Sequence, residues 1–346
     1  MKTFKKIVKI SCGILLSTLL IFLIIGYFTT RNDFKTPPEH YTTIGSRVYT
    51  AAPAMMVDSV YDSLNLNGRG IKIGVLDAGF GGLRQRPWTQ NLHVAAYANF
   101  VSGDTLGFFT EKAGRNRDHG AYSCACIGGC LTQDTIKGLA WGATYYLAEI
   151  DDMDAEPRLE EVRMMNGIRW LLAHGVDIIT SSCGHTTFDD YDGYSVQMLD
   201  GHSSRISCFI DSVLQANPNL IFIQSIGNEG DKPWRYENFP ADVREVISVG
   251  VVEKDSTTRA RYSGIGREKT DYIKPDVCAY VQPPRKGASF STPAIAGLCA
   301  TLLEHKRMSR KELINLLHTS GLNHSAPNNE IGYGVPQTSR MPTLFD

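Results

Sequence analysis

The chain has 346 residues, of which 35 are lysine or arginine and 36 are aspartate or glutamate, so its formal net charge is -1. Hydrophobic residues make up 42% and charged residues 21%, a composition that is typical of a folded globular protein and excludes an intrinsically disordered one. Basic residues do not cluster into a stripe, so no nucleic-acid partner is expected.

The N-terminal part of the chain differs from the rest. Residues 1–9 are rich in lysine, and residues 10–28 form an apolar stretch that would be about 28 Å long as a helix, close to the thickness of the bilayer's hydrocarbon core. We predict a short cytoplasmic N-terminus at 1–9, a transmembrane anchor at 10–28 and a linker at 29–45. The alternative for residues 10–28 is a cleaved signal peptide, although no small-residue cleavage site follows them.

The flanking charges predict how this anchor is oriented. Lysines precede the apolar stretch, whereas Arg31 and Lys35 are the basic residues just after it. Because the more basic flank stays in the cytoplasm, we expect the main domain outside it, in the periplasm or at the cell surface. If the segment is removed as a signal, the protein is instead secreted.

The cysteines favour free thiols over disulfide bonds. Of eight cysteines, Cys12 lies in the apolar stretch, so at least one of the remaining seven has no partner within the chain. Cys124, Cys126 and Cys130 fall on one predicted helix, where a disulfide would strain the backbone. Without a CxxC pair or a histidine-rich segment, a zinc site is not expected. We interpret these residues as buried thiols that pack as small hydrophobic side chains.

From residue 46 to the end the chain alternates between strand-like and helix-like patterns, as parallel α/β folds do. Apolar spacing predicts a helix that ends near Gly175, and Ser309 with Glu312 forms a capping box for a last helix. With no internal repeat, one domain over 46–346 is expected. Short apolar runs predict buried strands at residues 71–76, 176–180, 220–224 and 246–252.

Four polar residues stand where predicted strands or helices meet loops: Asp77, His119, Asn228 and Ser289. Asp77 directly follows a strand, and in open parallel sheets ligands bind beyond the carboxyl ends of strands. His119 opens a helix of small residues, Ser289 precedes another, and Asn228 follows a strand. Taken singly, each has a structural explanation, as a turn residue or as a helix cap.

Taken together and in this order, the four residues and their neighbours resemble the subtilases, the subtilisin-like serine proteases of peptidase family S8. The resemblance extends from about residue 65 to 337 and implies an α/β, three-layer subtilisin-like fold with a mainly parallel central sheet. Four motifs carry it: Val75-Leu-Asp-Ala-Gly79, Asp118-His-Gly120, Ile226-Gly-Asn-Glu-Gly230 and Gly287-Ala-Ser-Phe-Ser-Thr-Pro293.

The resemblance implies a serine endopeptidase that hydrolyses peptide bonds. Ser289 would be the nucleophile, and His119 the base that takes its proton and returns it to the leaving amine. Asp77 would orient His119, and the Asn228 side chain with the Ser289 backbone N–H would bind the oxyanion. Protein or peptide substrates are therefore the expected partners, besides the membrane contacted through residues 10–28.

Substrate is expected to bind as an extended strand beside Ser181, Ser182, Cys183 and Gly184, which match an edge strand of the family. We interpret Cys183 as a hydrophobic pocket wall; a reactive thiol is the alternative. The chemistry requires no cofactor. Structural calcium is common in the family, but we assign no residues to calcium or to any other metal.

Three features depart from the family pattern. Ala78 follows the acid, Ala288 precedes the nucleophile, and Ala121 with Tyr122 follows the base, at positions where other residues are usual. None of them removes a catalytic group. The alternative function is a catalytically silent binding or scaffold protein that keeps the subtilase fold at the cell envelope, because a fold alone does not imply a function.

Overall fold

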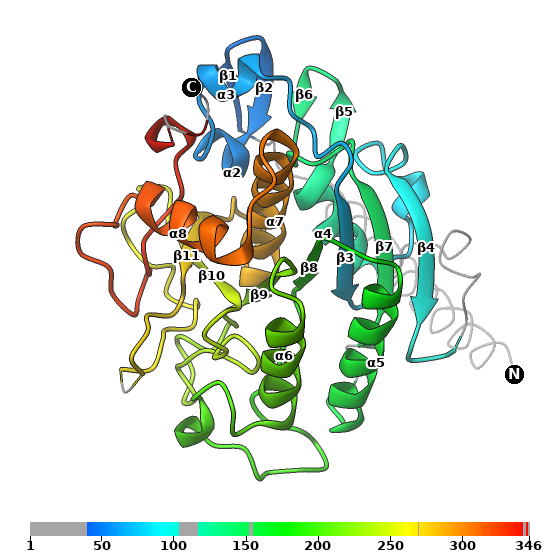
Figure 1. Cartoon of the computed structure of the whole chain (residues 1–346), viewed down its shortest axis with the longest axis vertical. Helices are drawn as coiled ribbons and strands as arrows, with labels where there is room; N and C mark the ends of the chain where they lie inside the picture. Colours follow the sequence, from blue (N-terminus) through cyan, green and yellow to red (C-terminus); the bar gives the residue numbers. More distant parts are fainter. Residues whose placement is uncertain (1–39, 104–116, 152–154, 269, 342–343, 345–346) are drawn as a thin grey trace, which may run out of the picture. The chain divides into compact units, whose positions relative to one another are not determined.

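The structure is a computed structural model that describes residues 40–103, 117–151, 155–268, 270–341 and 344. Tyr41–Asp346 forms one compact unit (Figure 1). The predicted anchor at residues 10–28 lies outside the described residues. Within the described part of the chain, no helix is both long and apolar enough to cross a membrane.

Seven parallel strands form the central sheet, in the order β11-β10-β9-β8-β3-β7-β4. Each of the four predicted strands is present, with ends shifted by no more than two residues. The strands are β3 Lys72–Asp77, β4 His93–Asn99, β7 Thr144–Glu149, β8 Ile178–Ser181, β9 Ile221–Ser225, β10 Ile247–Val252 and β11 Val277–Tyr280.

A smaller four-stranded sheet has the order β1-β2-β6-β5. Its first strand occupies residues that the sequence analysis assigns to the linker, because those residues pair in antiparallel register with the strand that follows. Its strands are β1 Tyr41–Ile44, β2 Arg47–Thr50, β5 Cys130–Thr132 and β6 Thr135–Ile136.

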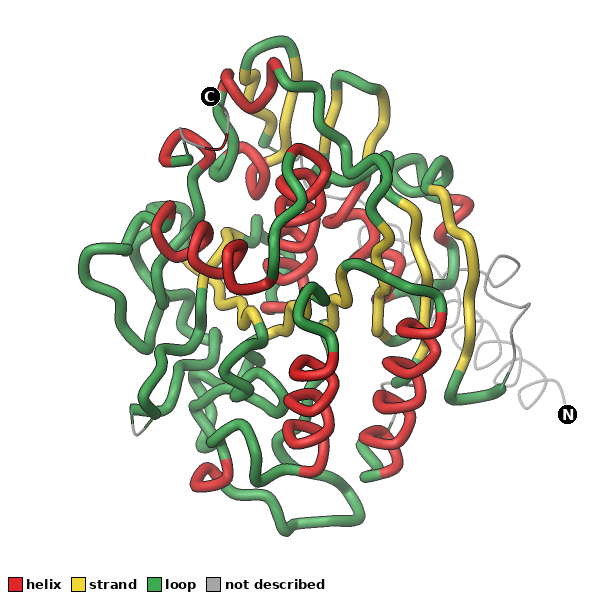
Figure 2. Tube along the Cα trace, viewed as in Figure 1, coloured by secondary structure: helices red, strands yellow, loops and turns green. Residues whose placement is uncertain are grey.

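Helices cover both faces of the central sheet, which gives the expected three layers (Figure 2). One face carries α4 His119–Gly128, α7 Ala288–His305 and α8 Arg310–Ser320, and the other carries α5 Leu159–Ala173 and α6 Arg205–Ala216. The short helices are α2 Ala51–Ala54, α3 Ser59–Ser63, η1 Leu83–Gln85, η3 Val196–Met198 and η4 Thr338–Arg340.

Strand β3 shows why these strands are continuous apolar runs. Ile73 and Val75 lie in the core cluster shared with α4 and α7, whereas Leu76 lies in the cluster shared with α5 and α6. Gly74 lets α5 pack directly on the strand, because a Cβ there would lie 2.7 Å from Leu171 Cδ1. Alternate residues point to opposite faces, and both faces of the strand are buried.

Helix α7 is the central helix of the molecule. Every residue from Ala288 to Leu303 is buried except Phe290, which is partly exposed. A Cβ at Gly297 would lie only 2.5 Å from the backbone oxygen of Ile127, so α7 packs closely against α4. Because its whole circumference is apolar or small, the helix has contacts on all sides.

The predicted capping box at the start of α8 is confirmed. Ser309 Oγ accepts from Glu312 N at 3.3 Å, and the Glu312 carboxylate accepts from Ser309 N at 2.7 Å. Two backbone groups that have no partner inside the helix are satisfied in this way.

The seven cysteines of the described residues are free thiols, as predicted, but they are not all buried. Cys208 is exposed, and Cys130 begins β5 instead of lying in the preceding helix. The helix ends earlier because Gly129 has extended backbone angles. The buried thiols are Cys124, Cys183, Cys278 and Cys299.

Candidate active site

Asp77 and His119 are in direct contact. Asp77 ends β3 and is fully buried, and His119 Nδ1 lies 2.5 Å from Asp77 Oδ1. Ala78 N donates to the same oxygen at 2.7 Å, and Ser123 Oγ donates to Asp77 Oδ2 at 2.7 Å. Asp77 thus accepts from three donors, one of which is the His119 ring. We therefore assign the proton of the neutral ring to Nδ1, which leaves His119 Nε2 as an acceptor.

Close backbone packing brings the two residues together. Gly79 has φ 64, in the left-handed region that favours glycine, and a Cβ there would lie 2.4 Å from the Arg117 backbone oxygen. Gly120 N donates to Gly79 O at 2.8 Å. The loop after β3 thus touches the start of α4, which explains the glycines beside both residues in the sequence.

The environment of His119 favours its protonated form. Burial alone lowers the pKa of His119, but the charge and hydrogen bond of Asp77 outweigh this effect and raise the pKa above its ordinary value of 6.5. Asp151 and Asp118 act in the same direction. The Phe290 ring lies 5.7 Å from the His119 ring, so His119 has an apolar neighbour on that side.

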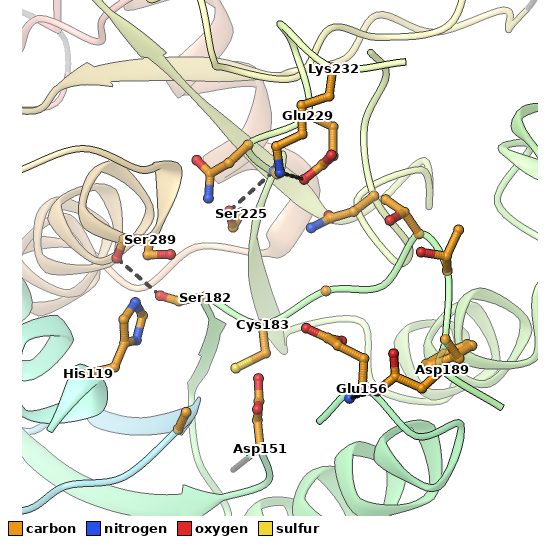
Figure 3. A pocket seen from close by; sticks show the side chains of 18 residues that line it. His119, Asp151, Glu156, Ser182, Cys183, Asp189, Ser225, Glu229, Lys232 and Ser289 are labelled. Atoms are coloured by element: carbon orange, nitrogen blue, oxygen red, sulfur yellow. Dashed lines mark hydrogen bonds and ion pairs between the residues drawn. The ribbon is translucent and has the colours of Figure 1, made fainter. Parts of the chain in front are cut away.

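Ser289 lies in the first turn of α7, and the N-cap of this helix is Gly287, with φ 128. Ser289 is therefore not the helix cap. Pro293 lies in the second turn, because α7 already begins at Ala288. Proline has no N–H to give to the Ser289 carbonyl one turn before it, and Ser182 Oγ donates to that oxygen at 3.1 Å instead (Figure 3).

Asn228 lies in the loop after β9, beside the start of α7. Its Oδ1 accepts from Ala288 N at 2.8 Å, which assigns the orientation of the amide and leaves Nδ2 to donate elsewhere. Asn228, His119 and Ser289 line one pocket of about 430 Å³. Figure 3 shows His119 and Ser289 side by side at one end of this pocket.

Three of the four predicted substrate-binding residues line the same pocket: Ser182, Cys183 and Gly184. Ser181 does not; it ends β8 fully buried, and its Oγ donates to the Cys183 carbonyl at 3.0 Å. Gln224 Nε2 donates to the same carbonyl at 2.7 Å. The Cys183 carbonyl therefore faces the interior and is already hydrogen-bonded.

The Cys183 side chain is a wall of the pocket. Burial raises the pKa of its thiol well above the ordinary value, and the nearby carboxylates of Asp151 and Asp77 raise it further. The thiol is protonated at neutral pH, which supports its interpretation as a hydrophobic wall and argues against a reactive thiol.

The sequence analysis missed several residues of the site. Ser123 is one helical turn after His119 on α4, so helical spacing would have placed the two side chains on one face. The acidic residues of the pocket come from separate loops, and none of them was assigned to the site from the sequence, although Glu229 follows Asn228 in its motif. They are Asp151, Glu156, Asp189 and Glu229.

A group of possible metal ligands lies at the wall of the pocket, although the sequence analysis assigns no metal ligand. Glu156, Glu160 and His185 each offer a ligand atom, and these atoms lie within 4.8 Å of one another. Glu156 is exposed and lines the pocket, whereas Glu160 and His185 are buried.

Comparison with protein families agrees with this geometry. The model of the subtilase family, Peptidase_S8, matches residues 68–334, which is most of the chain. The chain belongs to the subtilase family. It is therefore a hydrolase of the subtilisin-like serine endopeptidase class.

Subtilisin DY from Bacillus licheniformis is 22% identical over 279 residues, which cover 78% of this chain and 90% of that protein. Subtilisin E from Bacillus subtilis is 24% identical over 248 residues, which cover 70% of this chain but only 57% of that protein. Among solved structures, the CspB protease of Clostridium perfringens has a TM-score of 0.65 at 15% identity and covers 85% of this chain and 98% of its own. This likeness shows the fold alone.

Proposed function

We propose that this chain hydrolyses peptide bonds with Ser289 as nucleophile, His119 as general base and Asp77 as the group that orients His119. The observation that carries the proposal is the hydrogen bond between Asp77 and His119 Nδ1, at 2.5 Å, beside a pocket that Ser289 also lines. A serine hydroxyl is a weak nucleophile at neutral pH, so it needs a neighbouring base of this kind.

In the proposed reaction, His119 Nε2 takes the Ser289 proton while Oγ attacks the scissile carbonyl. The imidazolium then gives this proton to the leaving amine, and an acyl-enzyme remains. Water, activated by the same ring, releases the acid product and regenerates Ser289. Asp77 stabilises the imidazolium without becoming protonated, and its contact with Ser123 Oγ at 2.7 Å holds the carboxylate in position.

Asn228 and the backbone N–H of Ser289 would bind the oxyanion. The bond from Ala288 N to Asn228 Oδ1, at 2.8 Å, supports this role because it occupies the oxygen of the amide and leaves Nδ2 to donate to the oxyanion. The Ser289 N–H lies in the first turn of α7, where backbone N–H groups have no helical acceptor and the helix dipole favours negative charge. Donors held in advance stabilise the charge of the transition state.

Substrate would bind in extended form through the main chain of Ser182 and Gly184. Both line the pocket, whereas the carbonyl of Cys183 between them is already used by Gln224 and Ser181. Alternation of this kind is what pairing between extended strands requires. The pocket beyond them would receive one substrate side chain.

The decisive experiment compares the wild type with Ser289→Ala. We expect the wild type to cleave a casein-derived peptide mixture and to react with a fluorophosphonate label, and the variant to do neither. Thermal unfolding should remain close to wild type, because the Ser289 hydroxyl is not the cap of α7. A correctly folded wild type that neither cleaves nor labels would support the silent scaffold instead.

We also propose that residues 10–28 anchor the chain in a membrane, with residues 46–346 outside the cytoplasm as the peptidase domain. The apolar stretch and the lysines before it support this orientation. Carbonate washing should leave the protein in the membrane fraction, and added protease should reach the domain only from the extracytoplasmic side. A soluble form that begins near residue 30 would show that the segment is a cleaved signal.

No cofactor is proposed for the chemistry, because the side chains named above supply every proton transfer. We assign no calcium ligands.

A further inference from the structure

Beside the pocket, a buried histidine lies close to two carboxylates. His185 directly follows the pocket residue Gly184, and Glu160 lies in the first turn of α5. Glu156 lies just before that helix and lines the pocket (Figure 3). One potential ligand atom from each of Glu156, Glu160 and His185 lies within 4.8 Å of the other two.

His185 lacks the hydrogen bonds that a buried imidazole needs. Its side chain is 3% exposed, and neither ring nitrogen has a hydrogen-bond partner among the described residues. Nδ1 lies 3.8 Å from Glu160 Oε2, which is too long for a hydrogen bond. A buried polar group without a partner is unfavourable and calls for an explanation.

We propose that Glu156, Glu160 and His185 bind a divalent transition-metal cation of the Zn²⁺ type at the wall of the pocket. A neutral imidazole and two carboxylates are ligands that zinc uses in proteins, and their two negative charges balance those of the ion. With bonds of about 2.0–2.1 Å, a tetrahedral ion holds its ligand atoms roughly 3.4 Å apart. The separation of 3.8 Å between His185 Nδ1 and Glu160 Oε2 needs only a small adjustment to reach that value.

The ligand chemistry selects against calcium. Calcium takes 6–8 oxygen ligands, whereas this group offers one nitrogen and few oxygens. Glu156 is exposed and lines the pocket, so this ligand is accessible from solvent. A water molecule or a group of a bound peptide would complete the coordination of the ion.

The proposed ion would connect the segment that contains Glu156 with the segment that contains His185 and Asp189, and these two segments are already joined by hydrogen bonds. Glu156 N donates to Asp189 Oδ2 at 2.9 Å, and Asp189 N donates to the Glu156 backbone oxygen at 2.8 Å. The ion would link Glu156 and Glu160, at the start of α5, to His185 in the segment after β8. The site therefore goes beyond the proposed catalytic roles and does not depend on them.

The test uses the full chain carrying Ser289→Ala, which prevents self-digestion, after removal of metal with EDTA. Titration with ZnCl₂ in a calorimeter should show one equivalent of Zn²⁺ bound, and the thermal unfolding temperature should rise with it. Glu156→Gln and His185→Gln, each in this background, should weaken binding at least about 10–100-fold, the loss that even supporting residues of metal sites cause.

His202→Gln is the matched control, because His202 is an exposed histidine away from the pocket wall, and it should bind as the parent does. If His185→Gln does not fold, Glu156→Gln still decides the matter, since its side chain is exposed. Three results would overturn the proposal: no zinc binding, equal binding by Glu156→Gln and His202→Gln, or a response to Ca²⁺ but not to Zn²⁺.

Discussion

The two ends of the Asn228 amide have different neighbours, and two substitutions separate them. Asn228→Ala removes both the Nδ2 donor and the Oδ1 atom that accepts from Ala288 N at 2.8 Å. Asn228→Asp removes the donor but keeps an oxygen for Ala288. If Asn228 binds the oxyanion, both variants lose activity, whereas only the alanine variant loses the contact with α7.

The magnitudes follow from these contacts. Removal of one oxyanion donor costs about 2.7–4 kcal/mol of transition-state stabilisation, a drop of roughly 10²–10³ in kcat; subtilisin, a relative of this chain, is the reference case for that range. KM should change little in Asn228→Ala, because the contact forms only when the oxygen becomes charged. Asn228→Asp should lose at least as much activity, since its carboxylate repels the oxyanion. Only Asn228→Ala should lose about 0.5–1.5 kcal/mol of folding stability, the contribution of one hydrogen bond.

Steady-state cleavage of a fluorogenic peptide gives kcat and KM, and urea unfolding of each variant gives stability. Fluorophosphonate labelling of Ser289 should slow in both variants but persist, because His119 and Asp77 still activate the hydroxyl. If Asn228→Asp keeps a kcat near wild type, the oxyanion role is refuted. A less stable Asn228→Ala with normal kcat would make Asn228 a turn residue only.

The remaining predictions concern the acid, the base and the loop between them. The acid limb of kcat/KM against pH should lie above pH 6.5, because Asp77 raises the pKa of His119. Asp77→Asn should move this limb to lower pH. An acid limb at or below pH 6.5 in the wild type would contradict this reasoning. Ser123→Ala should lower the free energy of unfolding in urea by about 1.5–3 kcal/mol, because it removes a buried donor to Asp77. An unchanged unfolding midpoint would show that this hydrogen bond does not stabilise the fold. Gly79→Ala should destabilise the fold and lower kcat, because its Cβ would lie 2.4 Å from the Arg117 backbone oxygen. Gly70 has φ 76 but open space around it, so Gly70→Ala should show only the smaller cost of backbone strain. Equal effects of the two substitutions would refute the argument from close packing.

Local patterns in the sequence predict the framework of the fold well. The strand at 71–76 is an apolar run because both faces of β3 are buried. Such a run can be recognised in the sequence without knowing which helices or strands pack against it. The capping box of Ser309 and Glu312 is likewise local, since both residues lie within one turn. The residues Asp77, His119, Asn228 and Ser289 are predicted from motifs that resemble those of the subtilases, in which glycines and helix starts accompany them.

Features that depend on contacts between distant segments could not be predicted. The sequence groups Ser181 with Ser182, Cys183 and Gly184, but it does not show that the Ser181 side chain is buried and donates to the Cys183 carbonyl while the other three residues line the pocket. His185 and Glu160 are 25 positions apart and meet only because α5 packs beside the segment after β8. Neither residue has a neighbour in sequence that marks it.

The burial of α7 has a consequence for how the enzyme loses activity. Because this helix is enclosed along nearly its whole length, its amide hydrogens should exchange with solvent only when the entire domain opens, at the slow end of the hydrogen-exchange range. Ser289 is in the first turn of that helix, so it cannot leave its place by a local fluctuation while the rest stays folded. Inactivation by heat or denaturant should then coincide with global unfolding, and partly active, locally frayed forms should not accumulate.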